Sequence, residues 1–249
     1  MTEETIGKEF MRQTGPLGPR EPTAQEKGLP QPPLELPYDP QAPLIDLPDP
    51  LSTEIQPRDL RSVIAERRSL RKYAGEPISL AELSFLLWAS QGVKKVTTRP
   101  VTFRTVPSAG ARHAFETLLL INQVEGLQPG LYRYAAIEHA LVRLDMPEDI
   151  NWLITHACYE QSQVRTSAVT FIWVAVLERM EYRYGQRGYR YLHLDAGHIC
   201  QNLYLAAEVI RCGVCAIAAF HDDELNGVLG LDGEEQFTVY LGSLGRQPA

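Results

Sequence analysis

Apolar residues recur at helical spacing in three parts of the chain. The first is a short stretch that follows Asp59 and has apolar residues at Leu60, Val63 and Ile64. In the second part, Ser79 and Glu82 have the spacing of a capping box and predict a helix that stops near Gly92. The face of this helix that we expect to be buried contains Leu83, Leu86, Leu87 and Ser90.

The third part is the longest and predicts a helix over residues 189–211. One face of this helix would carry the apolar residues Leu192, Ala196, Ile199, Leu203, Ala206, Ala207 and Ile210. Gly213 follows, and we expect it to end the helix in the C′ position, where a positive φ favours glycine.

Other stretches have the composition of β-strands. We expect strands over residues 115–122, 130–134, 140–144, 168–177, 214–219 and 236–244. Residues 168–177 are apolar at nearly every position, which is typical of a buried central strand. Residues 130–134 and 140–144 are expected to pair as a hairpin, and residues 148–161 and 222–229 to form helices. This order of elements predicts an α+β fold with a central, mostly antiparallel sheet flanked by helices.

Proline divides the chain into two parts. Twelve of the 18 prolines lie within residues 1–57, and seven of them lie between Pro30 and Pro48. This density argues against a regular helix or a central strand. Apolar residues nevertheless recur there, namely Leu34, Leu36, Tyr38, Leu44, Ile45, Leu47 and Leu51. We therefore expect residues 1–55 to form an extended arm that lies across the body or across a partner subunit, and residues 56–249 to form the functional domain.

Composition and charge narrow the class of protein. Hydrophobic residues make up 44% of the chain and charged residues 22%, which is ordinary for a globular enzyme. The formal net charge of -7 argues against nucleic acid or an anionic membrane as the main partner. No run approaches the roughly 18 apolar residues of a membrane span, and the N-terminus does not resemble a secretory signal. We therefore expect a cytoplasmic protein.

Against this acidic background, residues 67–73 are strongly basic. They contain Arg67, Arg68, Arg71 and Lys72, with Ser69 among them. An adjacent pair of arginines on its own most often belongs to a solvated face. The whole group is better explained as a pocket for one compact, doubly charged anion, because each guanidinium presents a rigid fork of donors matched to phosphate oxygens. The phosphate of a cofactor is the anion that we expect.

Other chemically suggestive groups have simpler explanations. Cys212 and Cys215 match C-x-x-C, but no second pair has zinc-ligand spacing, so we expect the four cysteines to be buried and structural. His193 and His198 lie five apart and fail the spacing of a zinc-binding helix. The acidic residues after His221 suit a helix N-terminus. No metal site is expected. Several tyrosines could stack on a ligand or line an interface: Tyr182, Tyr184, Tyr189, Tyr191 and Tyr204.

Taken together, the motifs resemble a known family. Residues 67–73 look like the phosphate motif of the nitroreductase superfamily of FMN enzymes, residues 107–111 like its turn beside the flavin ring, and residues 195–207 like its central helix. With residues 130–134 and 187–191, the chain looks most like the SagB/ThcOx-type dehydrogenase branch. The resemblance extends into the arm and covers nearly the whole chain. No single motif is specific to this family, but the order in which the motifs follow one another along the chain is.

This resemblance implies a homodimer with two FMN molecules at the subunit interface. Four residues would hold the phosphate and ribityl chain: Arg67, Arg68, Ser69 and Arg71. The turn formed by Pro107, Ser108 and Ala109 would lie against the isoalloxazine ring, contributed by the other subunit. The opposite face of the ring would meet Ala218 and Ala219, where many relatives carry a Glu-Gly pair, and Arg246 could reach the phosphate.

The implied chemistry is hydride transfer through flavin N5. Typical members of the superfamily take hydride from NAD(P)H and reduce nitroaromatics or quinones, whereas the SagB/ThcOx branch includes enzymes that oxidise azoline rings in peptides with a Lys-Tyr pair. The corresponding residues here are Arg183 and Tyr184, which are therefore the catalytic candidates. Arginine in place of the lysine is a poor general base, because it stays protonated. Two other functions stay open, namely a flavin-binding partner subunit of a peptide-modifying complex and a flavin-degrading or cobalamin-linked relative.

Overall fold

The computed structural model describes residues 5–15, 21–51, 55–98 and 100–248. A seven-stranded sheet forms the centre, in the order β1-β6-β5-β4-β7-β9-β8, and every neighbouring pair is antiparallel. The strands are β1 (Leu44–Asp46), β4 (Phe115–Ile121), β5 (Gly130–Ala135), β6 (Ala140–Arg143), β7 (Val169–Val176), β8 (Cys212–Ile217) and β9 (Gln236–Arg246). The expected α+β fold with a mostly antiparallel sheet is confirmed.

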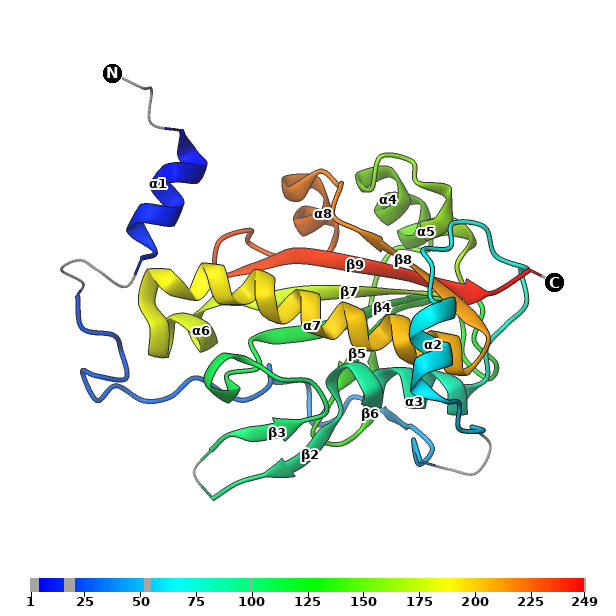
Figure 1. Cartoon of the computed structure of the whole chain (residues 1–249), viewed down its shortest axis with the longest axis horizontal. Helices are drawn as coiled ribbons and strands as arrows, with labels where there is room; N and C mark the ends of the chain where they lie inside the picture. The colour runs from blue at the N-terminus through cyan, green and yellow to red at the C-terminus, as the bar shows by residue number, and fades with distance from the viewer. Residues whose placement is uncertain (1–4, 16–20, 52–54, 99, 249) are drawn as a thin grey trace.

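Helices cover both faces of the sheet (Figure 1). One face carries α3 (Leu80–Gln91), α6 (Leu177–Tyr184) and α7 (Gly188–Val209), with α2 (Leu60–Glu66) packed against the C-terminal half of α7. The other face carries α4 (Ile150–Ala157), α5 (Ser162–Thr166) and α8 (Asp222–Val228). Strand β7 lies between β4 and β9 and is buried at all eight positions, as its apolar run predicts.

Local capping explains where the helices begin. In α3, the Ser79 side chain accepts a hydrogen bond from the backbone N of Glu82, and the Glu82 carboxylate accepts one from the backbone N of Ser79, so the predicted capping box is present. In α2, the Asp59 carboxylate accepts from the backbone N of Ser62. Each cap satisfies donors that the first helical turn leaves unpaired. No helix of the described residues is both long and apolar enough to cross a membrane.

Gly213 does not have the conformation that its position suggested. The residue with a positive φ after α7 is Arg211, at 56°, and Gly213 is already part of β8. The absence of a side chain at Gly213 has a different reason. A Cβ there would lie 2.6 Å from the Cβ of Leu70, so the glycine allows residues 67–71 to approach the strand closely.

Four further features were not predicted from the sequence or differ from the prediction. Residues 93–107 contain the hairpin β2 (Val93–Val96) and β3 (Thr102–Arg104), and residues 177–184 form α6. The helix expected over residues 148–161 ends at Ala157, because Tyr159 and Glu160 adopt positive φ values of 54° and 55°, and α5 begins beyond the expected range at Ser162. The turn at Pro107 continues into the short 3-10 helix η1 (Ala109–Ala111).

The proline-rich arm is more regular than expected. It contains the helix α1 (Ile6–Gln13), which lies before the first proline of the chain, and the edge strand β1, which pairs with β6. Figure 1 shows α1 projecting from the body. Between these elements the arm lies on the body, where the buried carboxylate of Glu116 accepts bonds from Arg179, at 2.6 Å, and from the backbone N of Leu36, at 2.8 Å.

Candidate active site

The basic cluster lies along the outer edge of β8, which is the last strand of the sheet. Ser69 forms a parallel bridge to Val214, and the backbone N of Leu70 donates to the carbonyl of Val214 at 2.9 Å. The segment after α2 therefore adds a short extended stretch to the sheet. This pairing fixes the backbone from which the side chains of Arg67, Arg68 and Arg71 extend.

These three arginines have no carboxylate partner within the described ranges of the chain. Arg68 and Arg71 are exposed, Arg67 is half-buried, and the Arg67 guanidinium lies 5.3 Å from the centre of the Tyr204 ring. Some arginines elsewhere are paired with carboxylates, as in the bonds from Arg58 to Glu66 and from Arg179 to Glu116. Three uncompensated guanidinium groups within five residues favour a compact anion.

Arg246, unlike these three arginines, already has a carboxylate partner. Its two terminal nitrogens donate to the two carboxylate oxygens of Glu82, each at 2.7 Å, and one of them also donates to the carbonyl of Ile210 at 2.8 Å. The guanidinium therefore joins the first turn of α3 to the end of α7. We do not propose Arg246 as a phosphate ligand, because its terminal nitrogens already bind the Glu82 carboxylate.

Ala218 and Ala219 follow directly after β8, and both are exposed. The carbonyl of Ala219 accepts a hydrogen bond from the Gln161 side chain at 2.8 Å, which ties this exit to the segment between α4 and α5. The absence of bulky side chains at both positions leaves the backbone open to a flat ring. These residues thus follow the strand whose edge carries the basic cluster, beyond the contact of that cluster with Val214.

The turn at Pro107, Ser108 and Ala109 is held by α7. The buried carboxylate of Asp195 accepts from the backbone N of Ala109 at 3.2 Å, and burial raises the pKa of this carboxyl. The Ser108 hydroxyl accepts from the backbone N of His113 at 2.9 Å. Two polar anchors therefore fix the backbone of this turn.

Arg183 and Tyr184 lie beside the same turn. A Cβ at Gly110, whose φ is 57°, would lie 2.5 Å from the Tyr184 hydroxyl and 3.1 Å from Cδ of Arg183. The Arg183 guanidinium is 5.7 Å from the centre of the Tyr184 ring, which in turn packs edge-on against Tyr191 at 4.7 Å. The structure thus brings both catalytic candidates to the predicted flavin turn, although the chain separates them by more than 70 positions.

Within one chain, the turn and the basic cluster do not converge. The turn is bonded to Asp195, and the cluster contacts Tyr204, which follows nine positions later on α7. Nine residues of an α-helix correspond to about 14 Å along the axis and to roughly opposite sides of the helix. Around and between these contacts α7 presents an exposed strip of residues: His193, Leu194, Gly197, His198 and Gln201.

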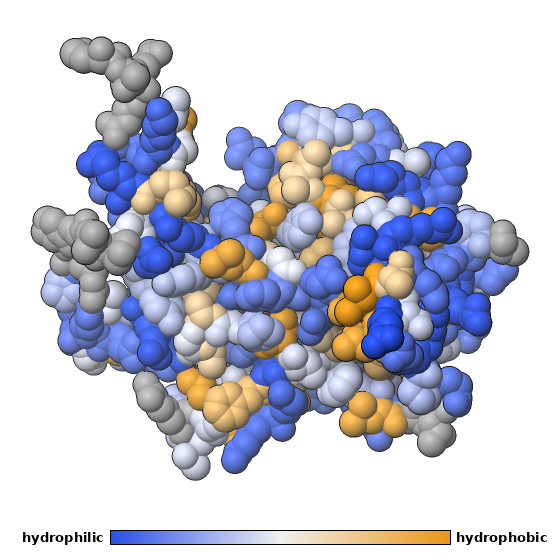
Figure 2. Space-filling view, viewed as in Figure 1, coloured by the Kyte–Doolittle hydropathy of each residue, from blue (hydrophilic) through white to orange (hydrophobic). Residues whose placement is uncertain are grey.

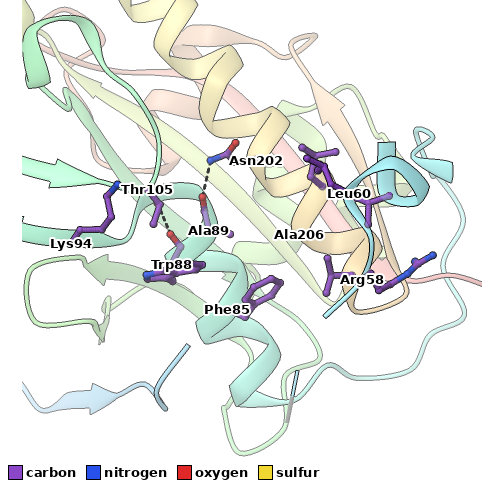
Figure 3. A pocket seen from close by; sticks show the side chains of 12 residues that line it. Arg58, Leu60, Phe85, Trp88, Ala89, Lys94, Thr105, Asn202 and Ala206 are labelled. Atoms are coloured by element: carbon purple, nitrogen blue, oxygen red, sulfur yellow. Dashed lines mark hydrogen bonds between the residues drawn. The ribbon is translucent and has the colours of Figure 1, made fainter. Parts of the chain in front are cut away.

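A cavity of about 410 Å³ lies elsewhere, between α2, α3 and the C-terminal half of α7 (Figure 3). Its walls are mainly apolar and include Leu60, Phe85 and Trp88. Leu60 is 62% exposed, and Figure 2 shows apolar groups at the surface over α2. None of the predicted cofactor ligands lines this cavity, which makes it an apolar groove beside the candidate site.

All four cysteines are buried, and no metal-binding group of three or more His, Cys, Asp or Glu side chains occurs among the described residues. Burial raises the pKa of Cys158, Cys200 and Cys212 to about 12. These thiols are therefore protonated at neutral pH, which fits their predicted structural role.

Comparisons with family models, with curated proteins and with solved structures agree with one another. A model of the Nitroreductase family matches residues 64–246. A protein of Methanocaldococcus jannaschii classed as a nitroreductase is 34% identical over 203 residues, which cover 82% of this chain and 96% of that protein. The trifolitoxin-processing protein TfxB of Rhizobium leguminosarum bv. trifolii is 28% identical over 133 residues, or 52% of this chain and 36% of TfxB.

A solved structure of a protein from Anabaena variabilis, also classed as a nitroreductase, matches with a TM-score of 0.64 at 32% identity. The match covers 76% of this chain and 38% of the Anabaena chain. This chain thus spans only a little more than a third of TfxB and of the Anabaena protein, but nearly the full length of the Methanocaldococcus protein.

Proposed function

Because this chain belongs to the Nitroreductase family, we propose that it is an FMN-dependent oxidoreductase of the SagB/ThcOx-like branch. The observation that carries the proposal is the basic cluster, in which Arg67, Arg68 and Arg71 have no ion-pair partner in the described parts of the chain. A phosphate dianion would accept charge-assisted hydrogen bonds from these groups, each worth about 1.5–3 kcal/mol.

The residues around this cluster suit the rest of the cofactor. Ser69 adds a hydroxyl donor beside the arginines, and the exposed Ala218 and Ala219 leave room for a flat ring. FMN, when bound, supplies a ring that accepts and donates hydride. The protein would hold the phosphate at one end of β8 and position the ring beyond the other end.

We propose that the complete site forms between two copies of the chain. Within one chain, the turn at Pro107 and the basic cluster contact opposite sides of α7. A second copy packed against the exposed strip of α7 would bring its own turn towards the basic cluster of the first. Gly197 lies in this strip, and a Cβ added there would meet nothing within 4 Å, so a second helix could approach closely.

We further propose that the enzyme works as a reductase with NAD(P)H as its hydride source and a nitroaromatic or quinone as acceptor. Arg183 occupies the place of the lysine expected for azoline oxidation, and a guanidinium stays protonated. A permanent positive charge beside Tyr184 suits an anionic acceptor or the phosphates of the nicotinamide cofactor. Tyr184 itself offers a hydroxyl that can donate a proton.

A second candidate function is that of a flavin-binding subunit in a peptide-modifying complex. Its support is the likeness to TfxB, whose name describes it as a trifolitoxin-processing protein. In that case, the chain alone would oxidise NAD(P)H slowly, and a peptide or partner protein would be needed for activity. Steady turnover of NAD(P)H with a quinone by the purified chain would count against it.

The experiment that tests the main proposal is flavin binding by the purified full-length chain. We expect yellow protein with close to one FMN per chain, or apoprotein that takes up added FMN. Removing two guanidinium groups in the Arg67→Ala/Arg71→Ala variant should weaken FMN binding by about two to four orders of magnitude. Colourless wild-type protein that does not bind FMN would reject the proposal.

A matched control is Arg165→Ala, which removes an exposed arginine of α5 on the opposite face of the sheet. This variant loses one positive charge at the surface, where the double variant loses two, and should bind FMN like the wild type. If Arg165→Ala weakened FMN binding as much as the double variant does, a general loss of positive charge, rather than a phosphate site, would explain the result.

A further inference from the structure

Tyr204 lies behind the basic cluster and connects it to β8. Its side chain is buried, with the residue 8% exposed, and its hydroxyl has two partners in the described residues. The backbone N of Ala216 lies 3.0 Å from the Tyr204 oxygen, and Ser69 Oγ lies 3.0 Å from the same oxygen. One buried phenol thus joins a helix, a strand edge and the predicted phosphate segment.

The backbone N–H of Ala216, the Tyr204 hydroxyl and the Ser69 hydroxyl favour one direction for the two hydrogen bonds, because it gives the proton of the phenol an acceptor. The backbone N of Ala216 can only donate, so the Tyr204 oxygen accepts from it. The Tyr204 proton is then directed to its other neighbour, Ser69 Oγ, which accepts. Ser69 has no other side-chain bond within the described segments, and its side chain is exposed. The Ser69 proton is therefore directed outward, away from Tyr204 and into the space beside the arginines.

We propose that Tyr204 is a positioning residue that holds the Ser69 hydroxyl as a donor to the cofactor phosphate. The chain of donors runs from Ala216 N–H through the Tyr204 hydroxyl to the Ser69 hydroxyl, and each bond polarises the next. This inference rests on the proposed function, and it assigns to Tyr204 a part in choosing the phosphorylated flavin over riboflavin, which has no phosphate.

Tyr204 also supports Arg67, but by a different part of the side chain. The Arg67 guanidinium lies over the face of the ring at 5.3 Å, a geometry that stabilises a cation. Tyr204→Phe keeps this ring and removes only the hydroxyl. The variant therefore isolates the donor chain from the stacking of Arg67.

The test compares the affinities of the apoprotein for FMN and for riboflavin, measured by quenching of flavin fluorescence. Ser69→Ala should lower the preference for FMN by about tenfold or more, because a charge-assisted bond is lost. Tyr204→Phe should lower it by about three- to tenfold, with little change in riboflavin affinity. In the double variant, the preference should equal that of Ser69→Ala alone, because Tyr204 acts through Ser69.

The matched control is Tyr73→Phe. The Tyr73 hydroxyl is also in the segment after α2, and it bonds to the carbonyl and the hydroxyl of Ser243, both at 2.9 Å. Its loss removes a part-buried hydroxyl that makes no direct hydrogen bond to Ala216, Tyr204 or Ser69. Both variants should lower the melting temperature, but only Tyr204→Phe should change the ratio of FMN to riboflavin affinity.

Three outcomes are distinguishable. If the wild type prefers FMN and Tyr204→Phe has the same preference, or if the effects of the two substitutions multiply, the role of Tyr204 is refuted while the proposed function stands. If the wild type binds neither flavin, the proposed function is rejected, and inorganic phosphate replaces FMN as the probe of the donor chain in thermal melts. A phosphate-dependent stabilisation that Tyr204→Phe reduces would then support the donor chain at an anion site, and no effect of phosphate would overturn the donor chain as well.

Discussion

Replacing Gly213 by alanine tests the close contact between Gly213 and Leu70, which allows the basic cluster to pack against β8. A Cβ at this position would lie 2.6 Å from both Cβ and Cδ2 of Leu70 and 3.2 Å from Cγ. Carbon atoms pack at about 3.5–4.0 Å, so the segment would have to move away from the strand by roughly 1 Å. Leu70 Cβ is fixed to the main chain, and a rotamer change cannot relieve that contact.

The expected cost has two parts. Overpacking of a close contact costs about 1–3 kcal/mol. A shift of this size would also weaken the bond from the Leu70 backbone N to the Val214 carbonyl, now 2.9 Å long, and such a bond contributes about 0.5–1.5 kcal/mol. We therefore expect Gly213→Ala to lose about 2–4 kcal/mol of unfolding free energy. Because Ser69 moves with Leu70, FMN affinity should fall as well.

Urea denaturation of the apoprotein, together with FMN titration, measures both effects. Gly227→Ala is the control, since a Cβ there meets nothing within 4 Å and α8 is helical at that position. We expect this variant to be neutral or more stable by up to about 1 kcal/mol, because alanine is the better helix former. A Gly213→Ala protein within about 0.5 kcal/mol of the wild type, and with unchanged FMN affinity, would refute the packing argument.

Two further predictions concern groups outside the basic cluster. Burial lowers the pKa of His113 to about 3. Between about pH 6.5 and 3 the unfolded state therefore binds more protons than the folded state. The free energy of unfolding falls as the pH falls through this window. His113→Asn should reduce that loss in urea titrations, and an unchanged pH dependence would contradict it. Glu116→Gln leaves Arg179 buried without its charge partner and should cost about 3–5 kcal/mol, with faster proteolysis of the arm. Glu66→Gln, at the more exposed pair with Arg58, should cost about 1 kcal/mol or less, and equal costs for the two variants would refute the importance of burial.

The elements that the sequence predicted correctly depend on residues close together in the chain. The capping box of Ser79 and Glu82 spans three positions, and the apolar pattern of α7 repeats within each helical turn. The apolar run of β7 likewise predicted a buried strand by itself. Such signals are local because helical and strand periodicity act over a few residues. The basic cluster was recognisable for the same reason, since its arginines lie within one short segment.

The tertiary structure decided which of these side chains are available and what holds them. Arg246 looked like a phosphate ligand, but Glu82, 164 positions away, occupies both of its terminal nitrogens. Tyr204 was one of several tyrosines until the fold placed its hydroxyl between Ser69 and Ala216. The sequence does not encode these contacts locally, because the partners are distant along the chain. Only the packing of α7, α3 and the residues after α2 against the sheet brings them within hydrogen-bond distance.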